Sequence, residues 1–293
     1  MASLRDIQTK IAGVKKTRQI TRAMNMVSAA KLRGVQEKTE RFRPYAAKFA
    51  EVLGSLSQGV DPGIHPLLAQ PDKVETVALI LFTADRGLCG SFNMNLINAG
   101  LRFIKERKAA GQQVQVYIVG RKGRDFFKRR PEVDVKEALT GVMNVVDFDL
   151  AVQVARMGLD AFLSGQVQEV YYLYSNFRSM AHQTPTVAKL LPIAPEAAAG
   201  EEAKTGGQEY MTEPSAEQIL VDLLPRYVNV RIYSGLLETA TSEQAARMSA
   251  MDNATRNCKD MIENLTLLYN KARQAAITTE LMDIVGGAEA LKG

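Results

Sequence analysis

The chain has 293 residues, 46% of them hydrophobic and 24% charged, with a formal net charge of +5. This composition is typical of a soluble globular protein and excludes a chain that is disordered throughout. The two cysteines, Cys89 and Cys258, lie far apart and form no metal or redox motif, so we expect free thiols and no disulfide scaffold.

The amino terminus and the apolar runs predict no targeting or membrane segment. The opening MASLRDIQTK carries charges where a secretory signal needs an apolar core. The longest apolar run, Val77 to Phe82, is too short to cross a bilayer. We therefore expect the chain to stay in the compartment in which it is made.

Residues 1–60 predict a long helix. Ser3 is a candidate N-cap, and no proline follows until Pro44. Residues at spacings of three and four form a seam that is apolar at both ends and polar between Arg18 and Ser28. A stripe beside the polar part predicts a local relaxation of the supercoil. The seam is Leu4, Ile7, Ile11, Val14, Arg18, Thr21, Asn25, Ser28, Leu32, Val35, Thr39, Phe42, Ala46, Phe49, Leu53 and Leu56, and the stripe is Ile20, Met24 and Val27.

The positive charge is concentrated in this helix. Residues 1–57 contain 12 Lys and Arg and 4 Asp and Glu, a balance of +8 that leaves −3 for the rest of the chain. Lys15, Arg18 and Arg22 lie on one helical stripe. Such a stripe suits an acidic protein surface, nucleic acid or anionic lipid, or is simply a solvated coiled-coil face. No aromatic residues interleave with it, as single-stranded nucleic acid would require.

Residues 61–200 have the alternating pattern of an α/β domain. VALILFTA, VQVYIVG and EVYYLYSN predict buried strands, and TPTVAKLLPI predicts a strand at an edge. A helix follows DRGLCGSFN, and a second, amphipathic helix covers Asp147 to Ser164. The alternation indicates a largely parallel sheet of the Rossmann-like kind. Residues 201–214, small and polar, predict a linker.

Residues 215–293 predict a second long helix. Ser215 and Gln218 form a capping box, Pro225 predicts a kink, and the pattern continues to Gly286. Its seam consists of small or apolar residues, which allow close approach of a partner helix. These are Met251, Ala254, Cys258, Met261, Leu265, Leu268, Ala272 and Ala275.

Helix lengths decide the fold class. At about 1.5 Å per residue the two helices would be roughly 80 and 105 Å long, against roughly 30 to 40 Å for the α/β domain. We therefore predict an antiparallel coiled coil of the N- and C-terminal helices flanking a Rossmann-like α/β domain. The last helix should overhang by roughly 20 Å or more, so other chains should cover its apolar residues. Those residues are Ile277, Leu281, Met282, Ile284, Val285 and Leu291.

The sequence offers no catalytic constellation. It lacks a P-loop, and DRGLCGSFN lacks the spacing of a dinucleotide fingerprint, so we expect a plain turn in which Asp85 and Arg86 are turn and surface-contact residues. Neither His65 nor His182 has a partner at metal or triad spacing. We assign no catalytic, cofactor-binding or metal-ligating residue and no cofactor. A dinucleotide-dependent enzyme that uses the middle domain and a nucleic-acid-binding coiled-coil protein with an α/β head remain open as alternative functions.

Three segments carry a resemblance to a known family. They are the amino-terminal KIAGVKKTRQITRAMNMVSAAKLR, the central DRGLCGSFN, and the carboxyl-terminal SEQAARMSAMDNAT with YNKARQAAITTELMDIVGGAEAL. In this order they resemble the gamma subunits of bacterial F-type ATP synthases over essentially the whole chain. The resemblance implies a noncatalytic central-stalk rotor, which couples ion flow through the membrane c-ring to ATP synthesis or hydrolysis at the alpha/beta hexamer by rotation.

The resemblance also implies partners and contact residues. The partners would be the alpha and beta subunits, the epsilon subunit and the c-ring, with no nucleic acid, and the chain would be a peripheral protein on the cytoplasmic face of the bacterial inner membrane. Contacts with beta subunits would fall on Met24, Arg247, Arg273, Gln274 and Thr278.

Overall fold

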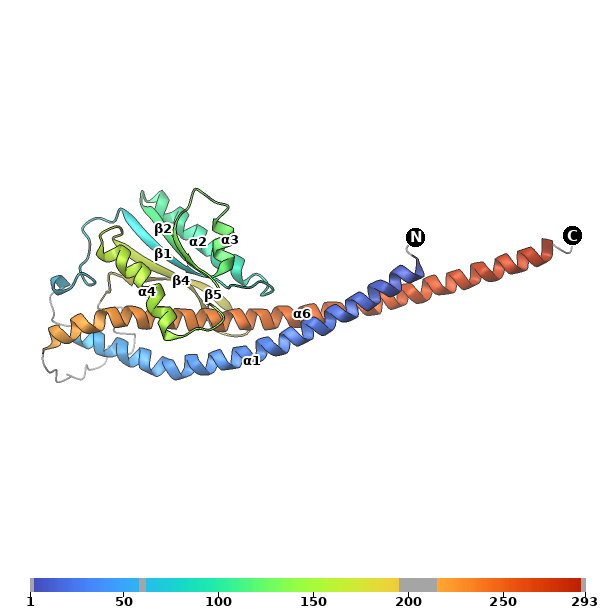
Figure 1. The fold of residues 1–293 in the computed structure, drawn as a ribbon, viewed down its shortest axis with the longest axis horizontal. Helices are drawn as coiled ribbons and strands as arrows, with labels where there is room; N and C mark the ends of the chain where they lie inside the picture. The colour runs from blue at the N-terminus through green and yellow to red at the C-terminus, as the bar shows by residue number, and fades with distance from the viewer. Residues whose placement is uncertain (1–2, 58–61, 195–214, 291–293) are drawn as a thin grey trace. The chain divides into compact units, whose positions relative to one another are not determined.

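The computed structural model describes residues 3–57, 62–194 and 215–290. The predicted linker, residues 201–214, lies outside the described residues. The chain divides into two compact units, a coiled-coil unit made of residues 1–28 and 248–293 and an α/β unit made of residues 29–247. Two helices contribute to both units, α1 (Leu4–Ser57) and α6 (Ala216–Ala290) (Figure 1).

A five-stranded sheet forms the centre of the α/β unit, in the order β3-β2-β1-β4-β5. The first four pair in parallel, and β5 is antiparallel to β4, so the predicted largely parallel sheet is confirmed. The strands are β1 (Thr76–Phe82), β2 (Gln113–Val119), β3 (Asp134–Leu139), β4 (Glu169–Phe177) and β5 (Gln183–Leu191).

Shorter helices connect the strands. They are the 3₁₀ turn η1 (Pro62–Ile64), α2 (Phe92–Ala109), α3 (Arg121–Phe127) and α4 (Phe148–Leu163). Helix α4 begins where the sequence predicts, because the carboxylate of Asp147 accepts a hydrogen bond from the N–H of Leu150 at 2.9 Å.

Each face of the sheet has its own hydrophobic core. Alternate residues of β1 point to opposite faces, so Val77, Leu79 and Leu81 pack against α2 while Ile80 and Phe82 pack on the other side. That second core contains α4 and the parts of α1 and α6 that belong to the α/β unit. The two long helices are therefore built into the domain, which confirms the predicted fold class.

Helix α6 lies very close to the sheet and is hydrogen-bonded to it. A Cβ on Gly235 would lie 2.9 Å from the ring of Tyr172, so only glycine fits at this crossing. One turn further, the N–H of Ser175 donates to the Thr239 hydroxyl at 3.2 Å, and the Ser242 hydroxyl donates to the carbonyl of Ser175 at 3.1 Å. Strand β4 and α6 are thus fastened by buried polar contacts as well as by packing.

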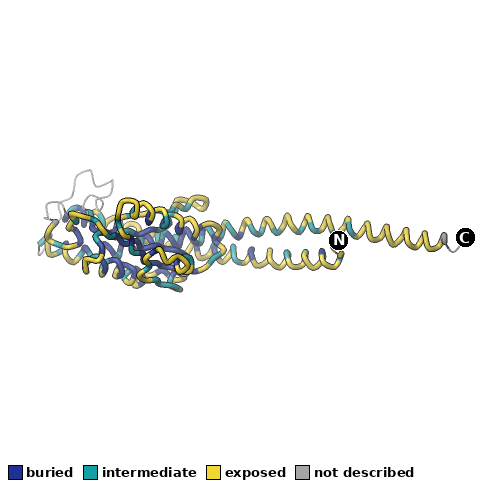
Figure 2. The backbone as a smooth tube through the Cα atoms, turned by 90° about the horizontal axis from the view of Figure 1, so that it is seen from above, coloured by how far each residue is buried: buried dark blue, intermediate teal, exposed yellow. Residues whose placement is uncertain are grey.

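In the coiled-coil unit the start of α1 lies along α6 (Figures 1 and 2). The predicted α1 seam is confirmed at Ile7, Thr21 and Ser28, which are buried. The predicted α6 seam is partly wrong, since Met261 and Leu268 are each 51% exposed. Apart from Ala254, which is half-buried as predicted, the half-buried positions after Met251 alternate by four and three, a regular heptad pattern. They are Thr255, Cys258, Ile262, Leu265, Tyr269 and Ala272.

Candidate functional site

The loop between β1 and α2 contains a buried carboxylate. Asp85 is only 7% exposed and accepts hydrogen bonds from the N–H groups of Arg121 at 2.9 Å, Gly141 at 2.7 Å and Met143 at 2.9 Å. These donors follow β2 and β3, so one side chain joins the loops after three parallel strands. The prediction that Asp85 is a plain turn or surface residue is wrong, whereas Arg86 is exposed.

The same loop presents an exposed apolar residue. Leu88 has a φ of 64°, in the left-handed region that non-glycine residues avoid, and its side chain is 63% exposed. This conformation costs about 1 kcal/mol or more, and it persists because the surrounding hydrogen bonds determine the loop. The loop therefore holds an apolar group toward solvent at the carboxyl edge of the sheet.

Arg247, predicted as a contact for another subunit, is buried within the α/β unit. Its guanidinium donates to the carboxylate of Glu243 at 2.7 Å and to the carbonyl of Gly87 at 3.3 Å. Burial raises the pKa of Glu243, and the neighbouring charge of Arg247 opposes that rise. Arg247 therefore has a structural role within this chain, since it ties α6 to the β1–α2 loop.

Met24 lies in the coiled-coil unit and is half-buried. On the same helix Ile20 and Val27 are 60% and 57% exposed, so part of the predicted stripe faces away from α6. Earlier on α1, a hollow of about 330 Å³ is lined by Lys15, Arg18, Gln19 and Arg22. This part of α1 thus presents apolar and cationic side chains next to each other.

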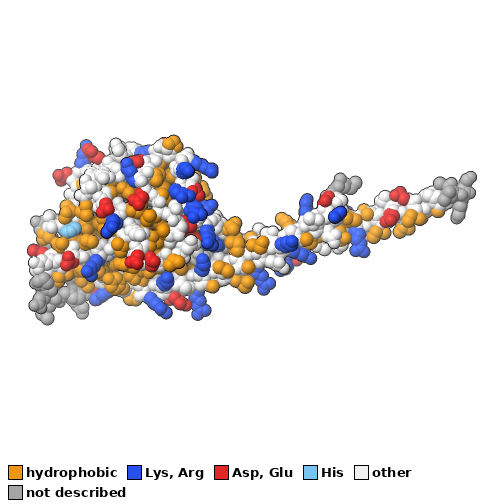
Figure 3. Space-filling model, viewed as in Figure 1, with side chains coloured by type: hydrophobic (Ala, Val, Ile, Leu, Met, Phe, Trp, Pro, Cys, Tyr) orange, Lys and Arg blue, Asp and Glu red, His pale blue; other side chains and the backbone are white. Residues whose placement is uncertain are grey.

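Arg273, Gln274 and Thr278 lie together on two turns of α6, and all three are exposed. The Thr278 hydroxyl donates to the carbonyl of Gln274 at 2.9 Å, within the helix. Every side chain described from Arg273 to Ala288 is exposed. Among them are large apolar residues, namely Ile277 (46%), Leu281 (57%), Met282 (67%), Ile284 (66%) and Val285 (51%). Figure 3 shows hydrophobic side chains exposed between charged ones on the visible face of this end of α6.

The structure brings together only part of the predicted contact set. The amide of Asn25, next to Met24, bonds to the carbonyl of Met248, and Arg273 lies 25 residues further along α6. At about 1.5 Å per residue, 25 residues correspond to roughly 35 to 40 Å along the helix axis. Met24 and the group of Arg273, Gln274 and Thr278 would therefore contact a partner at different heights along α6. Sequence reasoning missed Glu243, although its spacing of four residues before Arg247 is the signal of a helical ion pair.

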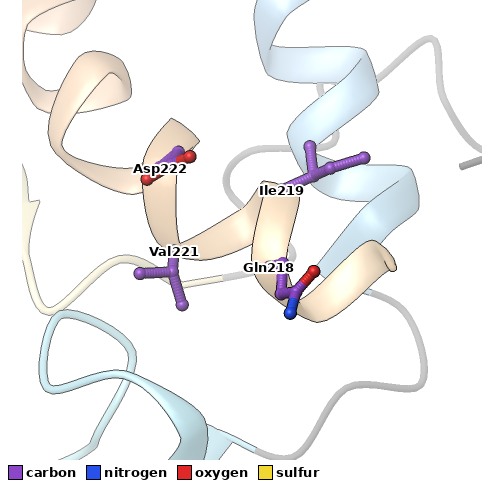
Figure 4. A pocket seen from close by; sticks show the side chains of 4 residues that line it. All are labelled: Gln218, Ile219, Val221 and Asp222. Atoms are coloured by element: carbon purple, nitrogen blue, oxygen red, sulfur yellow. The ribbon is translucent and has the colours of Figure 1, made fainter. Parts of the chain in front are cut away.

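The described residues contain no catalytic arrangement. No group of three or more His, Cys, Asp or Glu side chains within them could hold a metal ion. A hollow of about 450 Å³ at the start of α6 is lined by Gln218, Ile219, Val221 and Asp222, which all belong to this one helix (Figure 4). A single carboxylate beside two aliphatic chains supplies no acid–base pair. Within the described ranges, no helix has a segment long and apolar enough to span a bilayer.

Comparison with known proteins decides the family. The family model described as ATP synthase matches residues 3–291. The ATP synthase gamma chain of Syntrophobacter fumaroxidans is 55% identical, and that of Maridesulfovibrio salexigens is 53% identical, each over 100% of both chains. The chain belongs to the ATP synthase gamma-chain family. The resemblance predicted from sequence is confirmed, and the gamma chain is a noncatalytic rotor subunit rather than an enzyme.

Solved structures agree with this family. A chain of the Euglena gracilis mitochondrial ATP synthase, in a structure of OSCP, F1 and c-ring, matches with a TM-score of 0.69 at 21% identity, and the match covers 98% of the present chain and 94% of that chain. A chain of the Tetrahymena thermophila central stalk and c-ring matches with a TM-score of 0.59 at 25% identity, covering 80% and 99%. The α/β domain with two long helices is thus the fold of these ATP synthase chains.

Proposed function

We propose that this chain is the central-stalk rotor of a bacterial F-type ATP synthase, turning inside the alpha/beta hexamer and coupled to the epsilon subunit and the c-ring. The observation that carries the proposal is the end of α6, where large apolar side chains such as Met282 and Ile284 are about two-thirds exposed. Exposed apolar residues in series mark a surface that another protein covers. A ring of subunits surrounding a single helix covers all sides at once.

Rotation also needs contacts that break and re-form at every angle. Exposed cations such as Lys15, Arg18 and Arg22 provide these, because ion pairs at exposed sites are individually worth about 0 to 1 kcal/mol. The exposed Leu88, presented from a loop that Asp85 and Arg247 hold in place, offers a further contact. Of the proposed beta-subunit contacts, Met24, Arg273, Gln274 and Thr278 act directly, and Arg247 acts by fixing this loop.

The proposal includes a location and a domain division. The chain would be peripheral, on the cytoplasmic face of the inner membrane, held there through its complex. Residues 1–60 and 215–293 would form the coiled coil, residues 61–200 the α/β domain and residues 201–214 a linker. The nucleic-acid-binding alternative has no support from the comparisons.

The proposal is tested by direct observation of rotation. The purified chain is mixed with an isolated alpha/beta hexamer, a bead is attached to the α/β unit, and ATP is added. Stepwise rotation in one direction is the expected result. Failure of the chain to enter a hexamer that accepts a known gamma subunit would overturn the proposal.

A paired variant then tests the contact residues. Arg273→Ala with Gln274→Ala should lower torque while leaving the unfolding free energy of the chain unchanged, because both side chains are exposed. The matched control is Lys259→Ala with Asn264→Ala, two exposed residues earlier on α6. Equal torque in the two variants would exclude Arg273 and Gln274 as contacts.

A further inference from the structure

The outer layer of the α/β unit, which consists of α2 and residues 121–133, is strongly basic. It contains 10 Lys and Arg and 3 Asp and Glu, a balance of +7 in a chain whose net charge is +5. The acidic residues elsewhere in the chain hide this concentration in the overall sum. The layer packs on the sheet through residues such as Leu96 and Phe127, on the face opposite α1 and α6 (Figure 1). The long helices therefore supply no counter-charges to it.

The cations of this layer lack anionic partners along α3. Four of them are exposed, and within the described residues none of these four side chains forms an ion pair or a hydrogen bond. They are Arg121, Lys122, Lys128 and Arg129. The nearby acidic residues are already paired, since Asp125 accepts from Arg124 at 2.7 Å and Glu132 lies 3.7 Å from Arg130. Figure 3 shows Lys and Arg side chains gathered over α3. Unpaired like charges repel one another, and an anionic partner would relieve that repulsion.

The fold holds α3 firmly against the sheet. Phe127 is 2% exposed and belongs to the core on this face. The N–H of Gly123 donates to the Thr83 hydroxyl at 3.0 Å, and the N–H of Lys122 donates to the carbonyl of Ala84 at 3.1 Å. A Cβ on Gly123 would lie 2.9 Å from the same hydroxyl, so no space remains between helix and sheet. The four cations thus extend from a rigid backbone, which lowers the entropy cost of binding a partner.

The spacing of the cations suits a protein segment. Lys128, at the C-cap of α3, has helical dihedral angles, with φ of −54° and ψ of −26°. It therefore lies about two turns, or roughly 10 Å, from Arg121 on the same side of the helix. Carboxylates seven residues apart on a partner helix repeat at the same interval. Carboxylates also match the planar fork of an arginine side chain.

Two other anionic surfaces fit this layer less well. Single-stranded nucleic acid stacks its bases on exposed aromatic rings, whereas Phe127 is buried and the half-buried Phe126 lies under the Arg130 guanidinium, 4.9 Å from the ring centroid. A flat lipid surface against the outer layer would lie along α6, which runs over the opposite face of the sheet (Figure 1). The proposed rotor directs α6 away from the membrane, so the exclusion of lipid rests on the proposed function.

We propose that the outer face of α3 docks an acidic segment of another protein, whose carboxylates pair with Arg121, Lys122, Lys128 and Arg129. Each of these ion pairs would be exposed and individually weak, and several together give binding that is reversible and sensitive to salt. The docking site itself follows from the charges and the packing of the α/β unit alone.

The test uses the full-length chain and a lysine-free helical peptide with Glu residues at seven-residue spacing. Arg121→Gln with Lys128→Gln should weaken peptide binding about tenfold. The matched control is Arg41→Gln with Lys271→Gln, which removes the same charges at exposed positions outside the layer and should leave the affinity unchanged. On the unmodified chain, bound peptide should protect Lys122 and Lys128 from acetylation and leave Lys16 and Lys271 reactive.

Four results would overturn the inference. They are no binding of the peptide, an equal loss of affinity in the control variant, equal protection of Lys16 or Lys271, and tighter binding of phosphatidylglycerol vesicles or a DNA duplex to the same lysines. The last result would mean that the layer recognises phosphates rather than protein carboxylates. The rotor proposal is affected by none of them, since the measurements use this chain without its subunit partners.

Discussion

The guanidinium of Arg247 donates to the carboxylate of Glu243 at 2.7 Å, one turn apart on α6, and the two side chains are 9% and 6% exposed. Removing two charges from water is costly, so a buried pair of this kind is stable only while both partners are present. Arg247 also donates to Gly87, and it thereby joins the loop after β1 to the helix. Replacing only one of the two residues should therefore lower the free energy of unfolding more than replacing both.

Arg247→Met should lower the free energy of unfolding by about 3 to 5 kcal/mol, because Glu243 is left buried and unpaired. Arg247→Met with Glu243→Leu should recover most of that loss. Urea unfolding of the full chain measures both. The control is Arg256→Met, which removes an exposed ion pair with Asp252 and should cost about 1 kcal/mol or less. A single variant as stable as the control would contradict the structural role of Arg247.

Two substitutions of Asp85 should lower the free energy of unfolding by different amounts, because they remove different numbers of hydrogen bonds. Oδ1 accepts from Arg121 and Gly141, and Oδ2 accepts from Met143. Asp85→Asn can keep the first two contacts and should cost about 1 to 2 kcal/mol, whereas Asp85→Ala leaves three donors unpaired and should cost about 3 kcal/mol or more.

Hydrogen exchange separates these outcomes residue by residue. In Asp85→Asn the N–H of Met143 should lose protection while those of Arg121 and Gly141 keep it. Asp125→Asn, which removes an exposed carboxylate on α3, is the control and should alter none of them. Equal loss at all three N–H groups in Asp85→Asn would mean that the whole loop opens.

Alanine substitutions at two glycines with positive φ should lower the free energy of unfolding by different amounts, because one adds only backbone strain and the other also adds a steric clash. Gly120 has a φ of 107°, and a Cβ there would lie 2.0 Å from the carbonyl oxygen of Thr83, whereas Gly111 has a φ of 78° and open space around its Cβ position. Gly111→Ala should therefore cost about 1 kcal/mol, from backbone strain alone. Gly120→Ala should cost about 3 kcal/mol or more, because clash is added to strain. Thermal unfolding of the two variants measures the difference, and equal values would show that the β1 end moves to accept the methyl group.

Periodicity predicted most of the architecture but not its polar connections. Strands β1, β2 and β4 were predicted because each is an apolar run, whereas β3 was missed because it is a largely exposed edge strand with charged residues such as Asp134 and Lys136. The α1 seam was predicted from spacings of three and four. The α6 seam was placed wrongly at Met261 and Leu268, since a helix with apolar residues on several faces offers more than one seam.

The contacts of Asp85 could not be predicted from local sequence. Its three donors lie 36 to 58 residues away along the chain and meet it only because β1, β2 and β3 end at one edge of the sheet. An Asp-Arg-Gly sequence after a strand is typical of an exposed turn. By contrast, the exposed end of α6 was predictable, because helix length alone shows that the chain cannot cover it.

Glu169, at the start of β4, predicts a pH-dependent effect. Burial alone would raise the pKa of Glu169, but hydrogen bonds donated by Lys189 and Tyr171, each at 2.7 Å, hold it below its usual value. The ionised Glu169 carboxylate therefore adds to the free energy of unfolding at any pH above its pKa in the unfolded chain. This contribution is lost as the pH falls through the lower pKa that Glu169 has in the folded chain. Lys189→Met should cost about 1 kcal/mol at neutral pH, and the cost should vanish in acid. Lys136→Met, which removes an exposed pair with Asp134, should show no such pH dependence in urea unfolding.

Truncation of α6 after Ala275 should separate folding from assembly. All described side chains beyond this point are exposed, so their removal takes away no packing within the chain. The unfolding free energy of the α/β unit should therefore stay within about 0.5 kcal/mol of the full chain, while entry into the alpha/beta hexamer or the torque generated there should fall.

A matched variant decides whether the apolar side chains or only the length of α6 matters. Leu281→Ser with Ile284→Ser keeps the helix length but removes two exposed apolar groups. If the hexamer covers this end of the helix, the variant should assemble more weakly than one carrying Thr279→Ser with Ala288→Ser, which changes exposed positions of similar number without removing large apolar groups. Loss of α/β folding on truncation would instead mean that this end of α6 stabilises the domain, contrary to its exposure.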